Sequence, residues 1–372
     1  MLFLQTQKND ICMKILQLIN NLGSGGAEKL ISEYVPELIS NGHSVEILII
    51  RKLNSVYIDE LERKNIVVNS LTDKYLYNPI VLFKLLLFLN NRKYDIIHVH
   101  LFPSLYWVSI AKIISFSKTK LIFTEHSTFN NRRNSKLFKF IDRFIYKKYS
   151  KIITISDATT INLKKHLGCK FSYNIKTVYN GVDLKSFNTN LNPKYKDTNK
   201  FILLQVASFR NAKDQDTVIR ALKNLPKNIE LVFVGDGERI NRCKTLSNYL
   251  ELNDRISFLG FQKNIQELIT QCDCLIMSSK YEGFGKAAVE GMACSKPVVA
   301  TNVEGLSDIV NGYGLLFDVG DEKKLSEHIL NLYNNKVFYE KIAKNCLIRS
   351  KDFDIQQMIS KYEEIYMEVL SE

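Results

Sequence analysis

The chain has few cysteines, no C-x-x-C pair and no apolar run of membrane-spanning length. Its seven cysteines among 372 residues are scattered and odd in number, which argues against a disulfide framework and favours a reducing compartment. Cys272 and Cys274 alternate in a strand-like run, and we interpret them as core residues. The longest apolar runs, such as 79–89, are far shorter than the roughly 20 residues that cross a bilayer. The N-terminus lacks a basic region followed by a long apolar stretch, so no secretory signal is expected.

Excess positive charge is confined to the first half of the chain. Residues 1–185 contain 27 Lys and Arg against 14 Asp and Glu, whereas residues 186–372 contain 24 against 25. A positive field of this kind can attract nucleic acid, an anionic membrane or a phosphate-bearing acceptor. Composition alone leaves these partners open.

Short apolar runs of strand length alternate with helical patterns in both halves. The expected strands of the first half are 13–19, 43–50, 65–71, 95–100, 120–126 and 151–156. The segment 177–200, rich in Asn, Pro, Lys and Gly, interrupts the alternation and is expected to link two domains. The expected strands of the second half are 201–207, 229–235, 255–260, 274–279 and 297–301.

This alternation predicts an α/β protein with two doubly wound parallel sheets in tandem. The first domain is expected at 1–185, with residues 1–12 as an appendage, and the second at 186–354. A C-terminal helix at about 355–372 is expected to pack back on the first domain. Ligands of such sheets bind at the carboxyl ends of the strands, so two facing domains place two half-sites across a cleft.

The most informative stretch is 278–300, SSKYEGFGKAAVEGMACSKPVVA. Glu282 lies in a loop after a strand, where its carboxylate can accept hydrogen bonds from sugar hydroxyls, and Glu290, two turns into the next helix, can reach a ribose. Either glutamate alone could instead be a helix cap or a solvated helix residue. The residues between them open the helix, and the backbone amides there suit a diphosphate. These candidate donor-binding residues are Gly283, Phe284, Gly285, Lys286 and Ala287.

The two glutamates resemble the E-x7-E signature of the family-4 glycosyltransferases. That resemblance implies the GT-B fold, two Rossmann-like domains facing across a cleft, and a retaining reaction. Gly25 and Gly26, followed by Ala27-Glu28, are similar to the family's first glycine-rich loop, where backbone amides approach the donor phosphates. A nicotinamide fingerprint would place glycine at position 28. The resemblance also places Gly235, at a strand end, near the nucleotide.

Residues 95–100 and 124–126 match two further strand ends of the family. The resemblance implies that His126 lies near the reacting sugar and acceptor, although a strand-end histidine bonded to backbone would have the same sequence. His100 and Glu125 are expected on the acceptor side, and His98 in the core. The two histidines of H-x-H have no nearby third ligand, which argues against a zinc site.

Two cations are expected to grip the diphosphate and to balance the charge that builds on it. Lys213 occupies the family's lysine position, but Ser208 stands at the usual arginine position and Arg210 is the candidate replacement. Asp214 and Asp216 form the D-x-D pattern that binds metal in another glycosyltransferase fold. Their place at the start of a helix favours helix capping instead. No metal ion or other cofactor is expected.

Residues 132–151 contain eight Lys and Arg and one acid, with apolar residues at helical spacing. This pattern predicts a basic amphipathic helix on an anionic membrane surface. The alternative is a helix that packs its apolar side on the sheet and exposes a basic rim. The membrane interpretation places the protein in the cytoplasm, peripheral on the inner face of the plasma membrane.

The expected function is retaining transfer of a sugar from a nucleotide-sugar donor, with UDP favoured, to a hydroxyl of a lipid-linked or polysaccharide acceptor. A glycan on a polyprenyl diphosphate, as in bacterial surface-polysaccharide assembly, is the expected acceptor, and nucleic acid is not an expected partner. One alternative is a GT-B nucleotide-sugar epimerase or phosphorylase. A second is a non-catalytic basic protein that binds membrane or nucleic acid, which would leave the glycine loops and paired glutamates unexplained.

Overall fold

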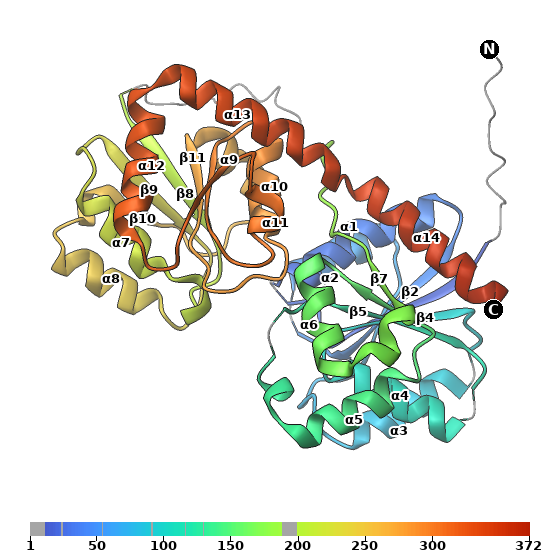
Figure 1. Cartoon of the computed structure of the whole chain (residues 1–372). Helices are drawn as coiled ribbons and strands as arrows, with labels where there is room; N and C mark the ends of the chain where they lie inside the picture. Colours follow the sequence, from blue (N-terminus) through green and yellow to red (C-terminus); the bar gives the residue numbers. More distant parts are fainter. Residues whose placement is uncertain are drawn as a thin grey trace, which may run out of the picture.

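The computed structural model describes residues 12–372 except 24, 54, 91, 116, 129 and 188–198. The expected appendage, apart from Cys12, and residues 188–198 of the expected linker therefore lie outside the described residues. The described chain forms two α/β domains joined by a pair of crossing segments (Figure 1). No helix in this part of the chain combines the length and apolar character that crossing a membrane requires.

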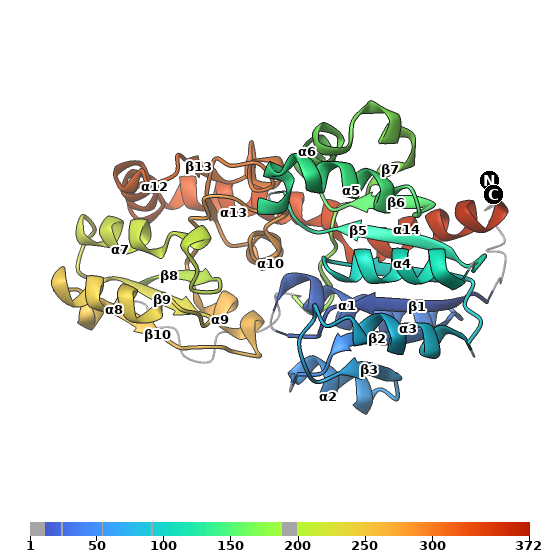
Figure 2. The same ribbon diagram turned by 90° about the horizontal axis from the view of Figure 1, so that it is seen from below.

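The first domain is built on a parallel sheet with strand order β3-β2-β1-β4-β5-β6-β7 within the described residues. Its strands are β1 (Lys14–Ile19), β2 (Ser44–Arg51), β3 (Val68–Thr72), β4 (Ile96–His100), β5 (Lys120–Glu125), β6 (Lys151–Thr154) and β7 (Ile175–Thr177). Its helices are α1 (Gly26–Ser40), α2 (Val56–Arg63), α3 (Ile80–Asn90), α4 (Ser104–Ser115), α5 (Lys136–Tyr146) and α6 (Asp157–Leu167), with 3-10 turns η1 (Asn131–Asn134) and η2 (Cys169–Asn174). Helices cover both faces of the sheet (Figure 2), which is why the central strands β1 and β4 are mainly apolar, with Gln17, His98 and His100 as buried polar exceptions.

The second domain has a parallel sheet with strand order β10-β9-β8-β11-β12-β13. Its strands are β8 (Phe201–Val206), β9 (Ile229–Val234), β10 (Ile256–Phe258), β11 (Cys274–Met277), β12 (Val298–Thr301) and β13 (Leu315–Phe317). Its helices are α7 (Gln215–Lys223), α8 (Ile240–Tyr249), α9 (Ile265–Gln271), α10 (Lys286–Ala293), α11 (Ser307–Val310), α12 (Glu322–Asn334) and α13 (Lys336–Ser350), with 3-10 turns η3 (Asn211–Lys213), η4 (Asn253–Arg255) and η5 (Lys351–Phe353).

The predicted fold class is confirmed, and each strand predicted from an apolar run is present. The pattern missed β7 and β13, which are three residues long and lie at the edges of their sheets. A run this short carries too few alternations to separate a strand from a loop. β7 also ends at Thr177, inside the segment expected to be a linker.

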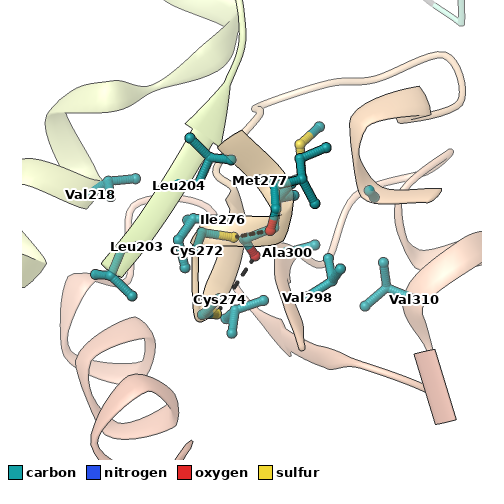
Figure 3. Packing of buried hydrophobic residues seen from close by; sticks show 14 of the residues in the cluster. Leu203, Leu204, Val218, Cys272, Cys274, Ile276, Met277, Val298, Ala300 and Val310 are labelled. Carbon is teal, nitrogen blue, oxygen red and sulfur yellow. Dashed lines mark hydrogen bonds between the residues drawn. The ribbon is translucent and has the colours of Figure 1, made fainter. Parts of the chain in front are cut away.

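Cys272 and Cys274 of the second domain are core residues, as predicted. Cys272 and Cys274 are 1% and 0% exposed and pack among apolar side chains of β8, β11 and β12 (Figure 3). Burial raises the pKa of the Cys274 thiol well above its usual value, so this thiol is kept in its unreactive form.

The chain crosses between the domains twice, and the two crossings lie side by side. Val182 forms a parallel bridge with Asp354, and a Cβ at Gly181 would stand 2.4 Å from the Cα of Ile355. The last helix, α14 (Ile355–Ser371), then packs on the first domain after α13 has covered the second (Figure 1). Tyr362, Tyr366 and their apolar neighbours on α14 share a core with β1 and α1.

The basic segment 132–151 is not the single amphipathic helix that its pattern predicts. It divides into η1, the eleven-residue α5 and the start of β6. Arg132 and Arg133 are buried against Asp142 and Glu125, and Lys151 pairs with Glu368 and Glu372. These three cations form ion pairs within the protein and are not available to a membrane. The spacing of residues along the sequence could not show these pairings.

Candidate active site

The predicted catalytic glutamate and lysine meet at the carboxyl ends of neighbouring strands of the second sheet. Glu282 lies in the loop from β11 to α10, and Lys213 ends η3, which follows β8. The Lys213 ammonium donates to Glu282 Oε2, and the Ser279 hydroxyl donates to the same oxygen at 3.3 Å. Both charged side chains keep about a fifth of their surface exposed, at 20% and 18%. The pair is therefore ionic, fixed and still accessible to a ligand.

The loop that carries Glu282 is fastened to the first domain through its backbone. The Thr128 hydroxyl donates to the Glu282 carbonyl at 3.2 Å, and the Ser156 hydroxyl donates to the Gly283 carbonyl at 2.8 Å. A Cβ at Gly283 would stand 2.6 Å from the carbonyl oxygen of His126. Only glycine permits this close approach. Gly283 of the E-x7-E motif is therefore needed for the contact between the domains, whether or not it also contacts a ligand.

The start of α10 has the geometry expected of an anion site. Gly285 is the N-cap with φ +86°, and the helix runs from Lys286 over eight residues. Its first backbone amides have no partner within the helix and point out of its N-terminus. The side chain of Phe284 is 2% exposed and packs against Tyr179 and Phe353. Phe284 can therefore contribute only backbone to a donor.

Glu290 and Lys286 of α10 are paired with side chains of α1 in the other domain. Lys29 Nζ donates to Glu290 Oε1 at 2.6 Å, and Lys286 Nζ donates to Glu33 Oε2. Glu290 is 3% exposed, and Lys286 also lies 4.0 Å from its carboxylate. The helices α1 and α10 accordingly lie against each other where the domains meet (Figure 2).

Burial and charge act in opposite directions on the two lysines of this network. Burial disfavours the Lys29 ammonium, but the carboxylates of Glu290 and Glu33 outweigh it and raise the pKa of Lys29. Burial lowers the pKa of Lys286 despite the opposing effect of Glu33. The network thus holds two carboxylates and one firmly charged ammonium at the domain junction.

The glycine loop before α1 places another carboxylate close to the second domain. Gly25 is the N-cap of α1 and Gly26 its first residue. A Cβ at Gly25 would stand 2.2 Å from Glu28 Oε2, so the carboxylate of Glu28 folds back over the loop. Burial raises the pKa of Glu28, and the positive charge of Arg210 acts against this rise. Arg210 is itself exposed, just before η3.

Gly235, predicted near the nucleotide, and the D-x-D pair, predicted to cap a helix, have structural partners of their own. Gly235 directly follows β9 and has φ +131°, and a Cβ there would stand 2.1 Å from the carbonyl oxygen of Ala207. Asp214 stands at the N-cap of α7, but its carboxylate accepts from the Thr217 hydroxyl at 2.7 Å and caps no backbone amide. Asp216 pairs with Arg239 at 2.8 Å. The capping prediction is thus right for the position of Asp214 and wrong for its hydrogen bond.

No group of three or more His, Cys, Asp or Glu among the described residues is arranged to hold a metal ion. In the D-x-D pair, the Asp214 carboxylate accepts from the Thr217 hydroxyl and the Asp216 carboxylate faces Arg239 and Arg242, so the two do not converge on a common point.

The two residues predicted on the acceptor side, His100 and Glu125, lie beneath the surface, next to the predicted catalytic His126. His126 is partly exposed, and its Nε2 stands 3.0 Å from Nδ1 of His100, which is 0% exposed. Glu125 is 6% exposed and bonds Arg133 at 2.7 Å and the Tyr146 hydroxyl at 2.8 Å. His100 and Glu125 thus support the site from below and do not line it, because buried polar groups require these internal partners. His98 is in the core, as predicted.

Sequence reasoning missed the residues that join the domains at the site. Lys29, Glu33, Thr128 and Ser156 each bond a residue of the second domain that is more than 120 positions away. Lys29 and Glu33 are spaced i,i+4, which in a sequence indicates only a solvated helix pair. Their partners become visible only when the two domains are placed together.

Comparisons with known proteins agree with this architecture. The family model for glycosyltransferase family 4 matches residues 24–186, and the model for glycosyl transferases group 1 matches residues 186–347. The chain is 27% identical over 367 residues to N-acetyl-alpha-D-glucosaminyl L-malate synthase of Bacillus anthracis, covering 93% of this chain and 94% of the relative.

Two further similarities cover nearly the whole chain. The first is to the N-acetylgalactosamine-N,N'-diacetylbacillosaminyl-diphospho-undecaprenol 4-alpha-N-acetylgalactosaminyltransferase of Campylobacter jejuni, 25% identical over 348 residues, covering 90% of this chain and 94% of the relative. The second is to the crystal structure of Anabaena HepE in complex with UDP-glucose, with a TM-score of 0.86, 24% identity, and coverage of 96% and 100%. The two family models together span both sheets and the E-x7-E loop, and the chain belongs to the family-4 glycosyltransferases of the GT-B fold.

Proposed function

We propose that the protein is a retaining glycosyltransferase that moves a sugar from a UDP-sugar to a hydroxyl of a polyprenyl-diphosphate-linked glycan, without a metal ion. The observation that carries the proposal is the Lys213–Glu282 ion pair beside the first turn of α10. It combines a cation and free amides for a departing diphosphate with a carboxylate for sugar hydroxyls. HepE was solved with UDP-glucose, and the Campylobacter relative is named for a diphospho-undecaprenol acceptor, which supports this choice of substrates.

The proposed reaction breaks the bond between the anomeric carbon and the phosphate oxygen and forms a bond from that carbon to the acceptor oxygen on the same face. The electron pair of the broken bond leaves with UDP, and the acceptor proton passes to the leaving phosphate oxygen. Lys213, with Arg210 beside it, and the first amides of α10 would stabilise the charge that builds on the diphosphate. Glu282 would orient the donor sugar, and Glu290 the ribose. Each of these groups acts by position and charge, so no separate base is needed.

The acceptor would reach this site from a membrane surface on the first domain, which we define as the exposed apolar side chains of α3 and α5. Leu137, Phe140 and Phe144 of α5 are 66%, 74% and 53% exposed, and Phe83 and Leu87 of α3 are 61% and 56% exposed. Ile145 and Ile141 of α5 pack in the core of the domain, in line with the alternative of a helix packed on the sheet, but the exposed side chains leave further apolar area that a membrane could cover. α4 packs against both helices on one side of the domain (Figure 1).

Lysines accompany the apolar residues of this membrane surface. Lys136 and Lys147 of the α5 region are exposed, and Lys139 and Lys148 are partly exposed. Each cation near an anionic bilayer contributes about 1 kcal/mol, and the aromatic side chains add apolar burial in the headgroup region. We therefore place the protein on the cytoplasmic side of an anionic membrane.

Product analysis tests the proposed reaction. The protein is incubated with UDP-sugars and GDP-sugars in turn, together with a short polyprenyl-diphosphate disaccharide, and the product is identified by mass spectrometry and proton NMR. We expect one UDP-sugar to give a glycoside with the anomeric configuration of the donor, at an unchanged rate in EDTA. An inverted linkage would contradict retention. Donor consumption with no acceptor present, giving an epimer, would instead support the epimerase alternative.

Vesicle binding tests the membrane surface separately. Replacing Leu137, Phe140 and Phe144 by Ser should release the protein from phosphatidylglycerol vesicles in a co-sedimentation assay. The matched control is Tyr249→Ser, which removes an 81% exposed aromatic ring from α8 of the second domain and should leave vesicle binding unchanged. Vesicle binding that is insensitive both to the triple replacement and to salt would contradict the surface and its charge.

A further inference from the structure

His126 is the outermost member of a buried chain of polar side chains that runs through the first domain to α14. His98 and His100 lie on one face of β4, with ring centroids 4.3 Å apart. His100 Nδ1 faces His126 Nε2 at 3.0 Å, and His100 Nε2 faces Gln17 Oε1 at 3.0 Å. The register pairs Gln17 with His98 across β1 and β4, which is why these side chains meet in the middle of the sheet.

The far end of this chain is held by the C-terminal helix. Gln17 Nε2 donates to the Tyr366 hydroxyl at 3.3 Å, and Tyr366 lies 2.7 Å from His98 Nδ1. His98 Nε2 lies 2.7 Å from the hydroxyl of Thr124, which precedes the Glu125–His126 pair. The Tyr34 hydroxyl of α1 donates to Gln17 Oε1 at 2.8 Å. Within the described residues, each ring nitrogen of His98 and His100 therefore has a partner, so both rings are fixed in orientation.

The three histidines are neutral in this environment. Burial lowers the pKa of His98 to about 3 and that of His126 to about 4, and it lowers the pKa of His100 well below its usual value. A neutral imidazole has one N–H donor and one acceptor nitrogen, so each hydrogen bond decides the direction of the next.

The direction is set at Gln17, because its amide oxygen can only accept. The Tyr34 hydroxyl, which lies 3.1 Å from His100 Nε2, donates its one proton to Gln17 Oε1 and can therefore only accept from His100. His100 Nε2 thus faces two acceptors and carries the proton. His100 Nδ1 is left as an acceptor, so His126 donates to it from Nε2. His126 Nδ1 keeps its lone pair, and no described residue bonds it.

We infer that Gln17 and His100 are positioning residues that hold His126 as its Nε2–H tautomer and leave Nδ1 to accept a hydrogen bond from a substrate hydroxyl. The part that concerns the hydroxyl rests on the proposed function. An acceptor nitrogen suits a sugar or acceptor hydroxyl, whereas the opposite tautomer would offer a donor to a phosphate oxygen. The network would thus select what His126 binds, and α14 takes part through Tyr366.

Nitrogen-15 NMR of the histidine rings tests the tautomer without any substrate. The chain has six histidines, so ring-labelled protein gives a small set of long-range proton–nitrogen correlations, and His126→Ala assigns the relevant signal. We expect wild-type His126 to be protonated on Nε2 and not to titrate between pH 6 and 8. Protonation on Nδ1 would overturn the inference, and it would do so whether or not the protein transfers a sugar.

Three variants test the positioning. His100→Phe removes the acceptor for His126. Gln17→Met keeps the side-chain length but removes the oxygen that accepts from Tyr34 and His100, so the Tyr34 hydroxyl is free to donate to His100 Nε2 as well as to accept from it. The matched control is His98→Phe, which alters the same strand and the same core but does not touch His126. In the first two variants we expect the His126 signal to move toward a mixture of tautomers, and the control to keep the Nε2–H signal.

Kinetics supply the second readout. We expect kcat to fall about tenfold or more in His100→Phe and Gln17→Met with the donor KM changed by less than about threefold, and both constants to stay within about threefold of wild type in His98→Phe. Equal losses of kcat in all three variants would show a merely structural role and overturn the inference. If His100→Phe does not fold, Gln17→Met and the wild-type tautomer still decide the outcome.

Discussion

The two domains share one fold, but the polar residues that we compare at their strand ends are buried in the first domain and partly exposed in the second. In the first domain His98, His100 and Glu125 are buried and satisfied by partners of the same domain. In the second, Lys213 and Glu282 remain charged and partly exposed. The first sheet therefore supplies a rigid support, whereas the second presents ionic groups to a ligand. The excess positive charge of the first half of the sequence lies elsewhere, in part on the exposed and partly exposed lysines of the α5 region.

The largest expected effect separates two carboxylates at the strand ends of the two sheets, Glu282 in the loop after β11 and Glu125 at the end of β5. Replacing Glu282 by Ala should lower kcat/KM for sugar transfer by roughly 10²–10³, because a group that orients the donor in the transition state is lost. The melting temperature should change little, since Glu282 is partly exposed and its loss leaves Lys213 accessible to water. Steady-state kinetics and thermal melting check both parts. Near-normal transfer would contradict the role of Glu282.

Glu125 should show the reverse behaviour. Glu125→Ala leaves the Arg133 guanidinium, whose side chain is 9% exposed, without its carboxylate partner. Breaking a buried ion pair from one side typically costs 3–5 kcal/mol, so we expect the free energy of unfolding to fall by about 3 kcal/mol. Denaturant titration measures this loss. Glu125→Gln is the matched control, because the amide keeps an acceptor for Tyr146 and Arg133, and it should recover part of the stability.

The sequence predicted the central strands and the order of the site motifs because each depends on local pattern. Apolar runs such as 201–207 are bounded by turn residues, and the Glu282–Glu290 spacing fixes one carboxylate in a loop and the other on a helix. The residues that pair with the buried side chains of the site could not be predicted from the sequence. Lys29 meets Glu290 across 261 positions, and Tyr366 meets Gln17 across 349. Neither pairing leaves a signal in one sequence, since it arises from how the domains and α14 pack.

The support role of the first domain also predicts a dependence of stability on pH. The pKa of His98 is lowered to about 3 by burial, compared with about 6.5 in an unfolded chain. Above pH 6.5 His98 is neutral in both the folded and the unfolded protein, and its contribution to the free energy of unfolding is fully present. As the pH falls below 6.5 the unfolded state binds the proton first, and stability is lost at about 1.4 kcal/mol per pH unit until about pH 3.

His98→Phe removes the pH-dependent contribution of His98, so the stability of the variant should fall less in acid than that of the wild-type protein. Between pH 6.5 and 5.0 the wild-type protein should lose about 2 kcal/mol more than the variant. At pH 7 the variant should be the less stable of the two, because Tyr366 and Thr124 lose a partner. Urea unfolding at several pH values measures both differences. Parallel pH curves for the two proteins would show that His98 is not held neutral.

The smallest expected effect concerns the place where the two domains meet. Lys29→Met removes the close partner of Glu290, a carboxylate that is 3% exposed. Lys286 at 4.0 Å compensates part of the loss, and Lys29 is itself a quarter exposed at 26%. We therefore expect the donor KM to rise about fivefold, which corresponds to roughly 1 kcal/mol, with a small increase in the radius of gyration as the domains separate. The control Lys324→Met breaks an exposed pair with Glu327 within α12 and should change neither quantity. An unchanged donor KM in Lys29→Met would mean that the first domain supports the chemistry only through His126 and the backbone contacts to the Glu282 loop.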